Sequence, residues 1–411
     1  MQEFNTDFHI HSKYSGGTSK NMELPLIARQ AELKGLDLVG TGDALNPKWH
    51  KHMRDNFVDE NNGVYSLRNS RTKFLTTAEV EDIKGVHHLI LFPSISSAED
   101  LMERFEKYST NIKKDGRAHV QLNGEEITDY VLDVNALIGP AHAFTPWTAI
   151  YKEYSSISEC YRENTKEIKF LELGLSADTG MADRISELQR ITFMTNSDAH
   201  SPNLNRLGRE FNRLLLRELS FKEIEYAIER KKGRRFVMNA GLNPREGKYH
   251  LSACTRCYLR FKLKDALRFR WRCPECNGAI KKGVMDRVNE LASWNKPKSP
   301  DHRPRYIHII PLAEVISLAT GIKTITSRKI KDKYNELIKK FGTEINILID
   351  RNIDEIKKLD PGIGQIIEKF RNDRIRYIAG GGGQYGRPTL KDEKDTYWGY
   401  GQSSLKQFIY R

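Results

Sequence analysis

Short apolar segments alternate with amphipathic segments over roughly the first 240 residues of the chain. Apolar runs of strand length occupy residues 8–11, 36–40, 73–80, 88–92, 137–140, 170–173 and 191–196. Helical periodicity is found at residues 24–34, 97–110, 182–190 and 221–231. Alternation of strand and helix patterns predicts an α/β fold with a largely parallel sheet.

Polar and ionisable residues fall near the places where the predicted strands end. They are His9, His11, Asp43, Glu79, His142, Glu172 and Asp198. Barrels of the α/β class carry their catalytic groups at the carboxyl ends of the strands. A glycine-rich phosphate loop, which would favour an open doubly wound sheet, is missing from the sequence. We therefore predict a barrel over residues 1–243, with the open sheet as the alternative.

Two short motifs carry pairs of metal-type side chains. His9 and His11 are two residues apart, so on a strand both imidazoles point to the same face. Asp198 and His200 repeat this spacing after the apolar run 191–194. We predict that the two pairs form two walls of one metal site.

Further candidate ligands lie at the ends of other apolar runs: Asp43, Glu79 and His142 follow such runs, and one of His87 and His88 precedes the run 89–92. Each of them alone is explained as a capping acid or a structural histidine, but their clustering at predicted strand ends favours a shared site. Mixed imidazole and carboxylate ligands favour Zn, Mn or Fe over Ca or Mg alone. Two or three such ions suit hydrolysis of a phosphate ester without a protein nucleophile. Glu172 either orients one of the histidines or is a structural acid.

Residues 244–288 form a second predicted unit. Cys254, Cys257, Cys273 and Cys276 make two CxxC pairs separated by fifteen residues, the spacing of a zinc ribbon with one structural zinc ion. Basic and aromatic residues alternate between the pairs, and they offer phosphate contacts and stacking surfaces for bases. The alternation over 268–272 also fits a strand with a packed aromatic face.

Charge is distributed unevenly along the chain. The net charge is +13, and residues 245–298 hold fourteen Lys or Arg residues against five Asp or Glu residues. Such a concentration is typical of a protein that binds a polyanion, although a solvated basic face has the same composition.

Two features restrict the class of protein. No apolar run reaches the ~18 residues that a bilayer span requires, and the N-terminus lacks a basic stretch followed by an apolar one. Four of the five cysteines lie in the CxxC pairs, which indicates metal binding in a reducing compartment rather than disulfides. We expect a cytoplasmic protein without a membrane partner.

The C-terminal part begins with a proline-rich stretch at 289–308, which we predict to be a linker. Residues 309–411 form a helical region, with helices expected at 312–318, 330–341 and 353–359. The segment 359–367 resembles the glycine turn of a helix–hairpin–helix, which contacts phosphate, but a helix end followed by a new helix has the same pattern. The run of four consecutive glycines within Ala379–Pro388 either lets the backbone approach a ligand or forms a flexible linker.

Several motifs together resemble a known superfamily. "HIHS", "TGD", Glu79, "VHHLIL", "PAHAF" and "NSDAHS" resemble the polymerase and histidinol phosphatase (PHP) superfamily of multi-metal phosphoesterases, whose fold is a distorted (β/α)7 barrel. Longer segments are similar to archaeal endonuclease Q, and they cover nearly the whole chain. They are "HIHSKYSGGTSKNM", "VGTGDALNPKW", "KKDGRAH", "LELGLSADTGMADRISEL", "NSDAHSP", the paired CxxC unit and "AGGGGQYG".

The resemblance implies a DNA repair endonuclease that cuts 5′ to hypoxanthine, uracil, xanthine or an abasic site. It implies eight metal ligands: His9, His11, Asp43, Glu79, His87, His142, Asp198 and His200. Among these, His9, His11, Glu79, Asp198 and His200 are expected to be catalytic. Asp43 stands where many superfamily members carry histidine, and Gly16 and Gly17 replace polar residues, so two or three zinc ions are implied in the barrel. Mg²⁺ or Mn²⁺ is an alternative catalytic ion.

The expected partner is double- or single-stranded DNA that carries a deaminated base. Candidate DNA contacts are Lys13, Arg117, Arg260, Arg270, Gly381, Gly382 and Arg387, and the loop 13–21 with Tyr65 is a candidate base pocket. Residues 403–411 offer at most a poor match to a sliding-clamp peptide. Two other functions fit parts of the pattern, namely a small-molecule phosphomonoesterase and a non-catalytic zinc protein that binds nucleic acid.

Overall fold

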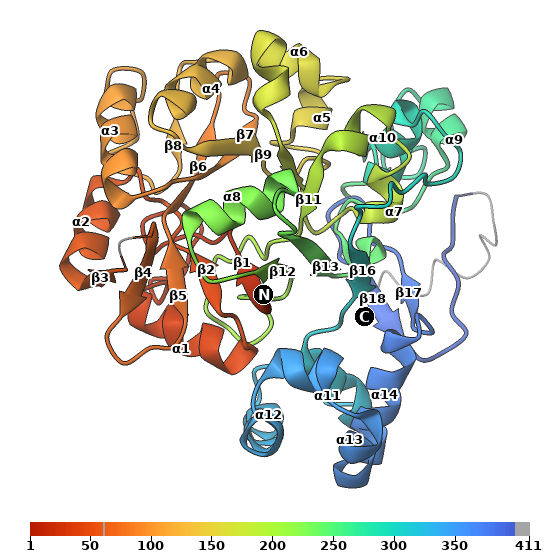
Figure 1. Cartoon of the computed structure of the whole chain (residues 1–411). Coiled ribbons are helices and arrows are strands. Elements are labelled where there is room, and N and C mark those ends of the chain that lie inside the picture. The colour runs from red at the N-terminus through yellow and green to blue at the C-terminus, as the bar shows by residue number, and fades with distance from the viewer. Residues whose placement is uncertain (61, 399–411) are drawn as a thin grey trace.

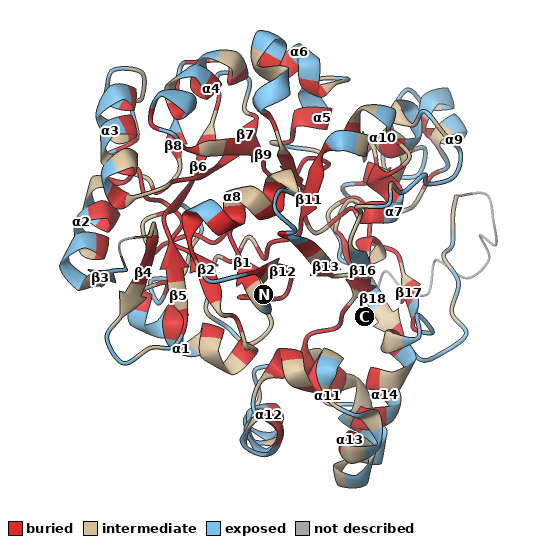
Figure 2. Cartoon of the chain, in the orientation of Figure 1, coloured by how far each residue is buried: buried red, intermediate tan, exposed pale blue. Residues whose placement is uncertain are grey.

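The structure is a computed structural model that describes residues 1–60 and 62–398, and its fold is of the α/β class. Strands and helices alternate through the N-terminal half, a small cysteine-containing unit follows, and a cluster of helices lies below the sheets (Figure 1). Red, buried segments run through the strands, whereas the helices expose their outer faces to solvent (Figure 2).

The largest sheet has eight strands within the described residues. In spatial order they are β16 (Arg305–His308), β13 (Arg235–Gly241), β12 (Phe211–Leu216), β1 (Gln2–Asp7), β2 (Leu38–Gly40), β5 (Lys73–Leu75), β4 (Val64–Leu67) and β3 (Phe57–Asp59). A four-stranded sheet follows the order β8 (Ala118–His119), β6 (Thr77–Glu81), β7 (His87–Leu91) and β9 (Leu137–Pro140). Strands β10 (Phe170–Glu172) and β11 (Thr192–Met194) form a parallel pair.

The sheets are mixed, so the expectation of a largely parallel sheet was wrong. β1 pairs in parallel with β2, but it pairs antiparallel with β12, and β7 is antiparallel to both β6 and β9. The reason is visible between β6 and β7, where only residues 82–86 connect the strands. A parallel pair needs a crossover of a dozen or more residues, so this short turn permits only a hairpin.

Contacts between the three sheets run around a ring. The amide of Gly42, after β2, donates to Thr77 Oγ1 at the start of β6. Gly139 in β9 lies so close to Phe170 in β10 that a Cβ there would be 2.4 Å from the Phe170 carbonyl oxygen. On the far side, Asn239 Nδ2 in β13 donates to the Phe193 carbonyl in β11. This ring brings the ends of β1, β6, β9 and β11 toward one another.

Helices surround the strands. They are α1 (Leu24–Lys34), α2 (Pro47–Asn56), α3 (Ile95–Glu106), α4 (Gly124–Asp133), α5 (Ile150–Glu153), α6 (Ile157–Tyr161), α7 (Thr179–Ala182) and α8 (Phe221–Glu229), with 3-10 turns at Arg162–Glu167, Ser186–Arg190 and Pro244–Glu246. The helix predicted at 182–190 was wrong, because α7 ends where it should begin and only a 3-10 turn follows. The predicted strand 73–80 is divided between β5 and β6.

The cysteine-containing unit consists of β14 (Ala253–Cys254), α9 (Leu263–Arg268), β15 (Ile280–Lys281) and α10 (Val284–Leu291). The strand suggested for 268–272 is absent from this described segment, because α9 ends at Arg268. Arg270 and Trp271 then adopt positive φ values of 49° and 58°, which form a turn. The predicted linker 289–308 was also wrong in part, since Arg305–His308 is strand β16 and pairs in parallel with β13.

The C-terminal helices are α11 (Leu312–Thr320), α12 (Arg328–Phe341), α13 (Ile353–Leu359) and α14 (Pro361–Arg371), with a π-helical turn at Asn346–Asp350. They enclose a core of their own that includes Ile316, Tyr334 and Ile367. The PGIG sequence forms the first turn of α14, and the side chain of Asp360 caps it by accepting the Ile363 amide. Strands β17 (Arg376–Ile378) and β18 (Arg387–Thr389) then form a hairpin around the glycine-rich loop.

Candidate active site

The two motifs with paired ligand-type side chains lie side by side. β1 ends at Asp7, so His9 and His11 lie just beyond the strand rather than on it as predicted. Ile10 nevertheless forms a parallel bridge with Ala199, and the His11 amide donates to the Ala199 carbonyl at 3.0 Å. The predicted convergence of the two motifs is therefore confirmed.

Glu79, on β6, lies at the centre of the cluster. Its Oε1 is 2.8 Å from His87 Nδ1 and 2.8 Å from His142 Nε2. Its Oε2 is 3.4 Å from His11 Nε2, and its Oε1 is 3.6 Å from His9 Nε2. One carboxylate therefore faces four imidazoles from three separate segments.

Asp198 extends the cluster on the side of the second motif. Its Oδ1 is 3.2 Å from His11 Nε2, 3.8 Å from His9 Nε2 and 3.5 Å from His200 Nδ1. The side chains thus form three overlapping groups with metal-ligand spacing: His9, His11 and Glu79; His11, Asp198 and His200; and Glu79, His87 and His142. Seven of the eight predicted ligands are brought together.

Asp43 is the exception, because it lies behind His11. Its Oδ1 is 3.1 Å from His11 Nδ1, the ring atom that faces away from Glu79. Its Oδ2 accepts the Ser12 amide at 2.6 Å and the Ser15 hydroxyl at 2.9 Å. Asp43 therefore stays outside the three groups and contacts the His11 ring from behind, the position of a carboxylate that orients a histidine.

Glu172 plays the same part for His9, as one of the two sequence interpretations suggested. Its Oε2 is 2.8 Å from His9 Nδ1, and its Oε1 accepts the His142 amide at 3.1 Å. The choice of His87 over His88 also agrees with the geometry. His88 points to the other face of β7, where its Nδ1 is 2.7 Å from the Tyr161 hydroxyl.

Two residues that the sequence analysis missed hold the motifs in place. Asn196 Oδ1 accepts the Phe8 amide, and its Nδ2 donates to Glu172 Oε2. Asp7 Oδ1 accepts the Ser197 amide from the opposite direction. Each of them stands two residues before the first ligand-type residue of its motif, a regularity that was available in the sequence as the only signal of their role.

The electrostatics of the cluster favour a cation. Burial alone would lower the pKa of His9, but the carboxylates of Glu172 and Glu79 outweigh burial and raise it to about 9. Burial would raise the pKa of Glu79, yet His87 and His9 hold it well below its usual range. His9 Nε2, His11 Nε2 and Asp198 Oδ1 are buried without a hydrogen-bond partner in the described residues. Buried polar atoms are rarely left in this state, and inward-facing nitrogen and oxygen atoms are the donors that divalent metals bind.

Arg117 faces the same cluster from the loop that precedes β8. Its Nη1 is 3.0 Å from Glu79 Oε2, and a quarter of the side chain is exposed. Lys13, another predicted DNA contact, forms an ion pair with Glu23 at 2.6 Å. The loop 13–21 borders the cluster, since the Ser19 amide donates to the His200 carbonyl at 2.8 Å. Tyr65 is buried, and its hydroxyl accepts the Ile95 amide, so its predicted part in a base pocket was wrong.

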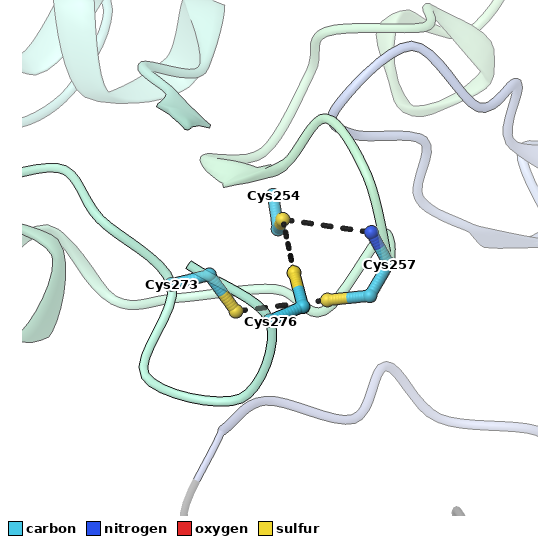
Figure 3. Close-up of side chains that lie close together, drawn as sticks. All are labelled: Cys254, Cys257, Cys273 and Cys276. Carbon is cyan, nitrogen blue, oxygen red and sulfur yellow. Dashed lines mark hydrogen bonds between the residues drawn. The ribbon is translucent and has the colours of Figure 1, made fainter. Parts of the chain in front are cut away.

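The four cysteines of the cysteine-containing unit converge, as the spacing of a zinc ribbon predicts. We call this unit, residues 244–288, the ribbon. Cys254 Sγ and Cys276 Sγ are 3.4 Å apart, and Cys257 Sγ and Cys273 Sγ are 3.6 Å apart. All four sulfur atoms lie within 4.8 Å of one another, and Figure 3 shows the side chains pointing toward a common centre. Four thiolates at this spacing fit one tetrahedral zinc ion.

The other arginines predicted to contact DNA differ in their surroundings. Arg260 donates to the Ala379 carbonyl at 2.6 Å and pairs with Asp395, so it holds the chain after β17 and is not free for phosphate. Arg270 is exposed on the turn after α9. Arg387 is exposed as well and pairs with Glu393 at 2.5 Å. The candidate clamp-binding segment 403–411 lies outside the described residues.

The glycine-rich loop packs against the ribbon, so neither DNA contact by Gly381 and Gly382 nor a flexible linker describes it. Both glycines are buried. A Cβ on Gly381 would lie 2.9 Å from Ala253 Cβ, and one on Gly382 would lie 2.3 Å from the Cys254 carbonyl oxygen. The glycines let two stretches of backbone meet where any side chain would separate them.

Replacing Gly382 by alanine is expected to lower the free energy of unfolding by about 2–4 kcal/mol, from a left-handed φ of 65° and the clash with Cys254. Gly321→Ala is the matched control, because Gly321 has a φ of 73° with nothing near its Cβ position. Urea denaturation of both variants separates backbone strain from the clash. Equal losses for both variants would contradict the close packing of the loop.

Comparisons with known proteins were made at the level of family, sequence and structure. Residues 311–374 match the MJ0043 C-terminal domain family. The uncharacterized protein MJ0043 of Methanocaldococcus jannaschii is 46% identical over 283 residues, which are 67% of this chain and 34% of that protein. The chain therefore spans about a third of the length of MJ0043. The uncharacterized protein YqxK of Bacillus subtilis is 30% identical over 411 residues, with 94% of this chain and 99% of YqxK covered.

Two solved structures resemble the chain over nearly its full length. One is the lesion-specific endonuclease PfuEndoQ of Pyrococcus furiosus, with a TM-score of 0.90, 46% identity, and coverage of 95% of this chain and 96% of that one. The other is endonuclease Q in complex with a 27-mer duplex that has an abasic lesion at its active site, with the same TM-score and identity and coverage of 95% and 97%. Among the described helices, none is both long and apolar enough to cross a bilayer.

The chain is 46% identical to both endonuclease Q structures, and each match covers 95% of it. This identity and coverage show that the chain belongs to the endonuclease Q family.

Proposed function

We propose that this protein is a DNA repair endonuclease that hydrolyses the phosphodiester 5′ to a deaminated base or an abasic site with the help of divalent ions. The observation that carries the proposal is the convergence of Glu79 and Asp198 with five imidazoles in one cluster, of which all members but Asp198 and His200 are buried. The similarity to a lesion-specific endonuclease, and to one bound to a duplex with an abasic lesion, supports DNA as the substrate.

Seven side chains would hold two or three zinc ions on a distorted barrel: His9, His11, Glu79, His87, His142, Asp198 and His200. Bound divalent ions lower the pKa of water to near neutrality and neutralise charge on a phosphate. Glu79 would be shared between two ions, since its two oxygens face different imidazoles. Asp43 and Glu172 keep the His11 and His9 rings oriented, which leaves each Nε2 free. The four ribbon cysteines would hold one further zinc ion.

Lesion selection follows from base chemistry. Extrusion of a nucleotide from a duplex costs least for a mispaired or missing base. Hypoxanthine and uracil both carry a carbonyl next to a ring N–H, where adenine and cytosine carry an amino group and an unprotonated nitrogen. A pocket of backbone donors and acceptors arranged for that pattern would accept both lesions and leave unpaired groups against the normal bases.

The experiment is a cleavage assay on end-labelled duplexes that carry one uracil, one hypoxanthine, one abasic site or no lesion, with Mg²⁺, Mn²⁺ or Zn²⁺ or with EDTA. We expect a nick 5′ to each lesion, no nick in the undamaged duplex, and no activity in EDTA. A phosphomonoester substrate is assayed in parallel. Hydrolysis of the monoester alone would contradict the proposal in favour of a small phosphatase, and binding without a nick would do so in favour of a non-catalytic protein.

Arg117→Ala is expected to lower the single-turnover rate by ~10²-fold or more, because the guanidinium, which lies beside Glu79, would meet a phosphate oxygen of the substrate. Arg104→Ala is the control, since Arg104 is exposed and pairs only with Asp133 in the described residues. Rapid-quench cleavage of a uracil duplex measures both rates. A rate for Arg117→Ala equal to that of the control would remove Arg117 from the substrate site.

A further inference from the structure

A cavity of about 340 Å³ lies in the seam between the N-terminal sheets and the ribbon. The loop after β9 and helix α5 form one wall, while β15 and α10 form the other, and Figure 1 shows α5 and α10 side by side. Arg287 on α10 donates to the Tyr151 carbonyl on α5, which fixes the two walls together. The volume of the cavity lies in the range of about 300–1,000 Å³ that is typical of small-ligand pockets.

Positive charge lines this cavity. Four of its lining residues are cations, namely Lys152, Lys281, Lys282 and Arg287, and none of the described lining residues is acidic. Lys282 and Arg287 pair with Glu290, and Lys152 pairs with Glu153. Within the described ranges Lys281 forms no ion pair with a carboxylate. Burial, together with the charge of nearby Lys152, lowers the pKa of Lys281. A half-buried ammonium beside a second cation is stabilised by an anion from outside.

Aromatic rings border the cations. Trp271 lines the cavity, and the Lys282 ammonium is 5.4 Å from the centre of its ring. Trp147 follows the lining residue Pro146, and Nζ of Lys281, which lines the cavity, is 3.7 Å from the centre of the Trp147 ring. Trp147 is 53% exposed. Exposed aromatic rings next to lysines form the surfaces on which single nucleobases stack.

The same loop joins the cavity to the candidate metal cluster. Phe144 and Thr145 line the cavity, and they follow His142 by two and three residues. Thr145 Oγ1 is 3.3 Å from His142 Nδ1. A nucleotide held in the cavity would therefore belong to the DNA next to the cleaved bond.

We propose that this seam binds one nucleotide of the DNA near the scissile phosphodiester, with its phosphate at Lys281 and Lys152 and its base against Trp271 and Trp147. The proposal rests on the proposed function, because it assumes a DNA substrate. The seam is a binding site in addition to the metal cluster. The N-terminal sheets and the ribbon form it together, so it exists only while the ribbon packs against α5.

The test measures the affinity of the protein for a 27-mer DNA duplex with one abasic site. All variants carry Glu79→Gln as well, so that the DNA stays intact. Lys281→Ala is expected to weaken binding about tenfold and to reduce the slope of log Kd against log salt by about one. Trp147→Ala is expected to weaken binding about tenfold through lost stacking, with Trp147→Phe closer to the parent. Lys264→Ala is the matched control, since Lys264 is an exposed ribbon lysine outside the cavity.

Phosphate position is mapped by replacing each phosphate near the lesion in turn with a neutral methylphosphonate. At one position, the methylphosphonate is expected to weaken binding of the DNA to the parent protein but not to Lys281→Ala. Equal affinities for Lys281→Ala and Lys264→Ala, or the absence of any such position, would overturn the seam site. Zinc content of each variant verifies that the ribbon is intact. Failure of the proposed function is separate, because it appears as wild-type protein that does not cut lesion DNA.

Discussion

Glutamine in place of Glu79 is expected to reduce the single-turnover rate of DNA cleavage at least ~10³-fold while the protein stays folded. One oxygen of Glu79 meets His87 and His142 at 2.8 Å each, and the other faces His11 at 3.4 Å. An amide has the same shape but carries no charge, and its NH2 group cannot bind a metal ion. Cleavage is measured by rapid quench on a uracil duplex, and bound metal is measured by mass spectrometry.

Glu81→Gln is the control for this substitution. Glu81 is two residues further along β6, and it contacts the outer side of His87 at 2.9 Å and His119 at 3.1 Å. It therefore orients one candidate ligand without facing the centre of the cluster, and we expect at most a ~10- to 100-fold loss of rate. If Glu79→Gln kept both its metal content and its cleavage rate, the shared-carboxylate arrangement would be wrong.

Lys34→Ala is expected to lower the free energy of unfolding by about 3–5 kcal/mol, because it leaves a buried carboxylate unpaired. Lys34 Nζ, at the end of α1, is 2.8 Å from Glu344 Oε1, and the side chains are only 1% and 3% exposed. Glu344 also accepts the Leu312 amide and the Tyr334 hydroxyl. This pair therefore joins the N-terminal sheets to the C-terminal helices. Urea denaturation followed by circular dichroism measures the loss.

Two comparisons make the interpretation specific. Lys51→Ala removes a lysine from an ion pair with Asp55 whose side chains are 76% and 55% exposed, so we expect a loss below about 1 kcal/mol. Lys34→Met combined with Glu344→Gln removes both charges and is expected to recover part of the loss, since neither charge then stays buried alone. A loss for Lys34→Ala as small as that for Lys51→Ala would show that the carboxylate finds water or another partner.

The position of this pair bears on function. The loop 202–204 that follows Asp198 and His200 borders a second cavity of about 330 Å³ together with α1 and α12. Lys34 on α1 and Glu344 just after α12 hold the same two helices together. Weakening the Lys34–Glu344 pair is therefore expected to disturb His200, at one end of the candidate metal cluster, before Glu79 at its centre is disturbed.

Much of the local structure was predictable from the sequence. The helix at 24–34 has the expected bounds, because Pro25 suits a first helical turn and Gly35 ends the helix with a φ of 91°. The strand at 137–140 and the helix at 353–359 also have the expected bounds. The spacing of the cysteines and of the paired ligand-type residues was sufficient to predict which side chains would meet.

What only the tertiary structure decided is how distant segments meet, and therefore which atoms face the cluster. Asp43 and Glu79 both follow apolar runs, yet Asp43 lies behind His11, where it accepts the Ser12 amide, whereas Glu79 on β6 meets His87 and His142 at the centre. Arg260 and the glycines at 381 and 382 look like DNA contacts by composition, but all three pack where the ribbon and the C-terminal hairpin meet. Periodicity and spacing are properties of neighbouring residues, whereas the partner of a carboxylate or a glycine is set by packing between segments far apart in the chain.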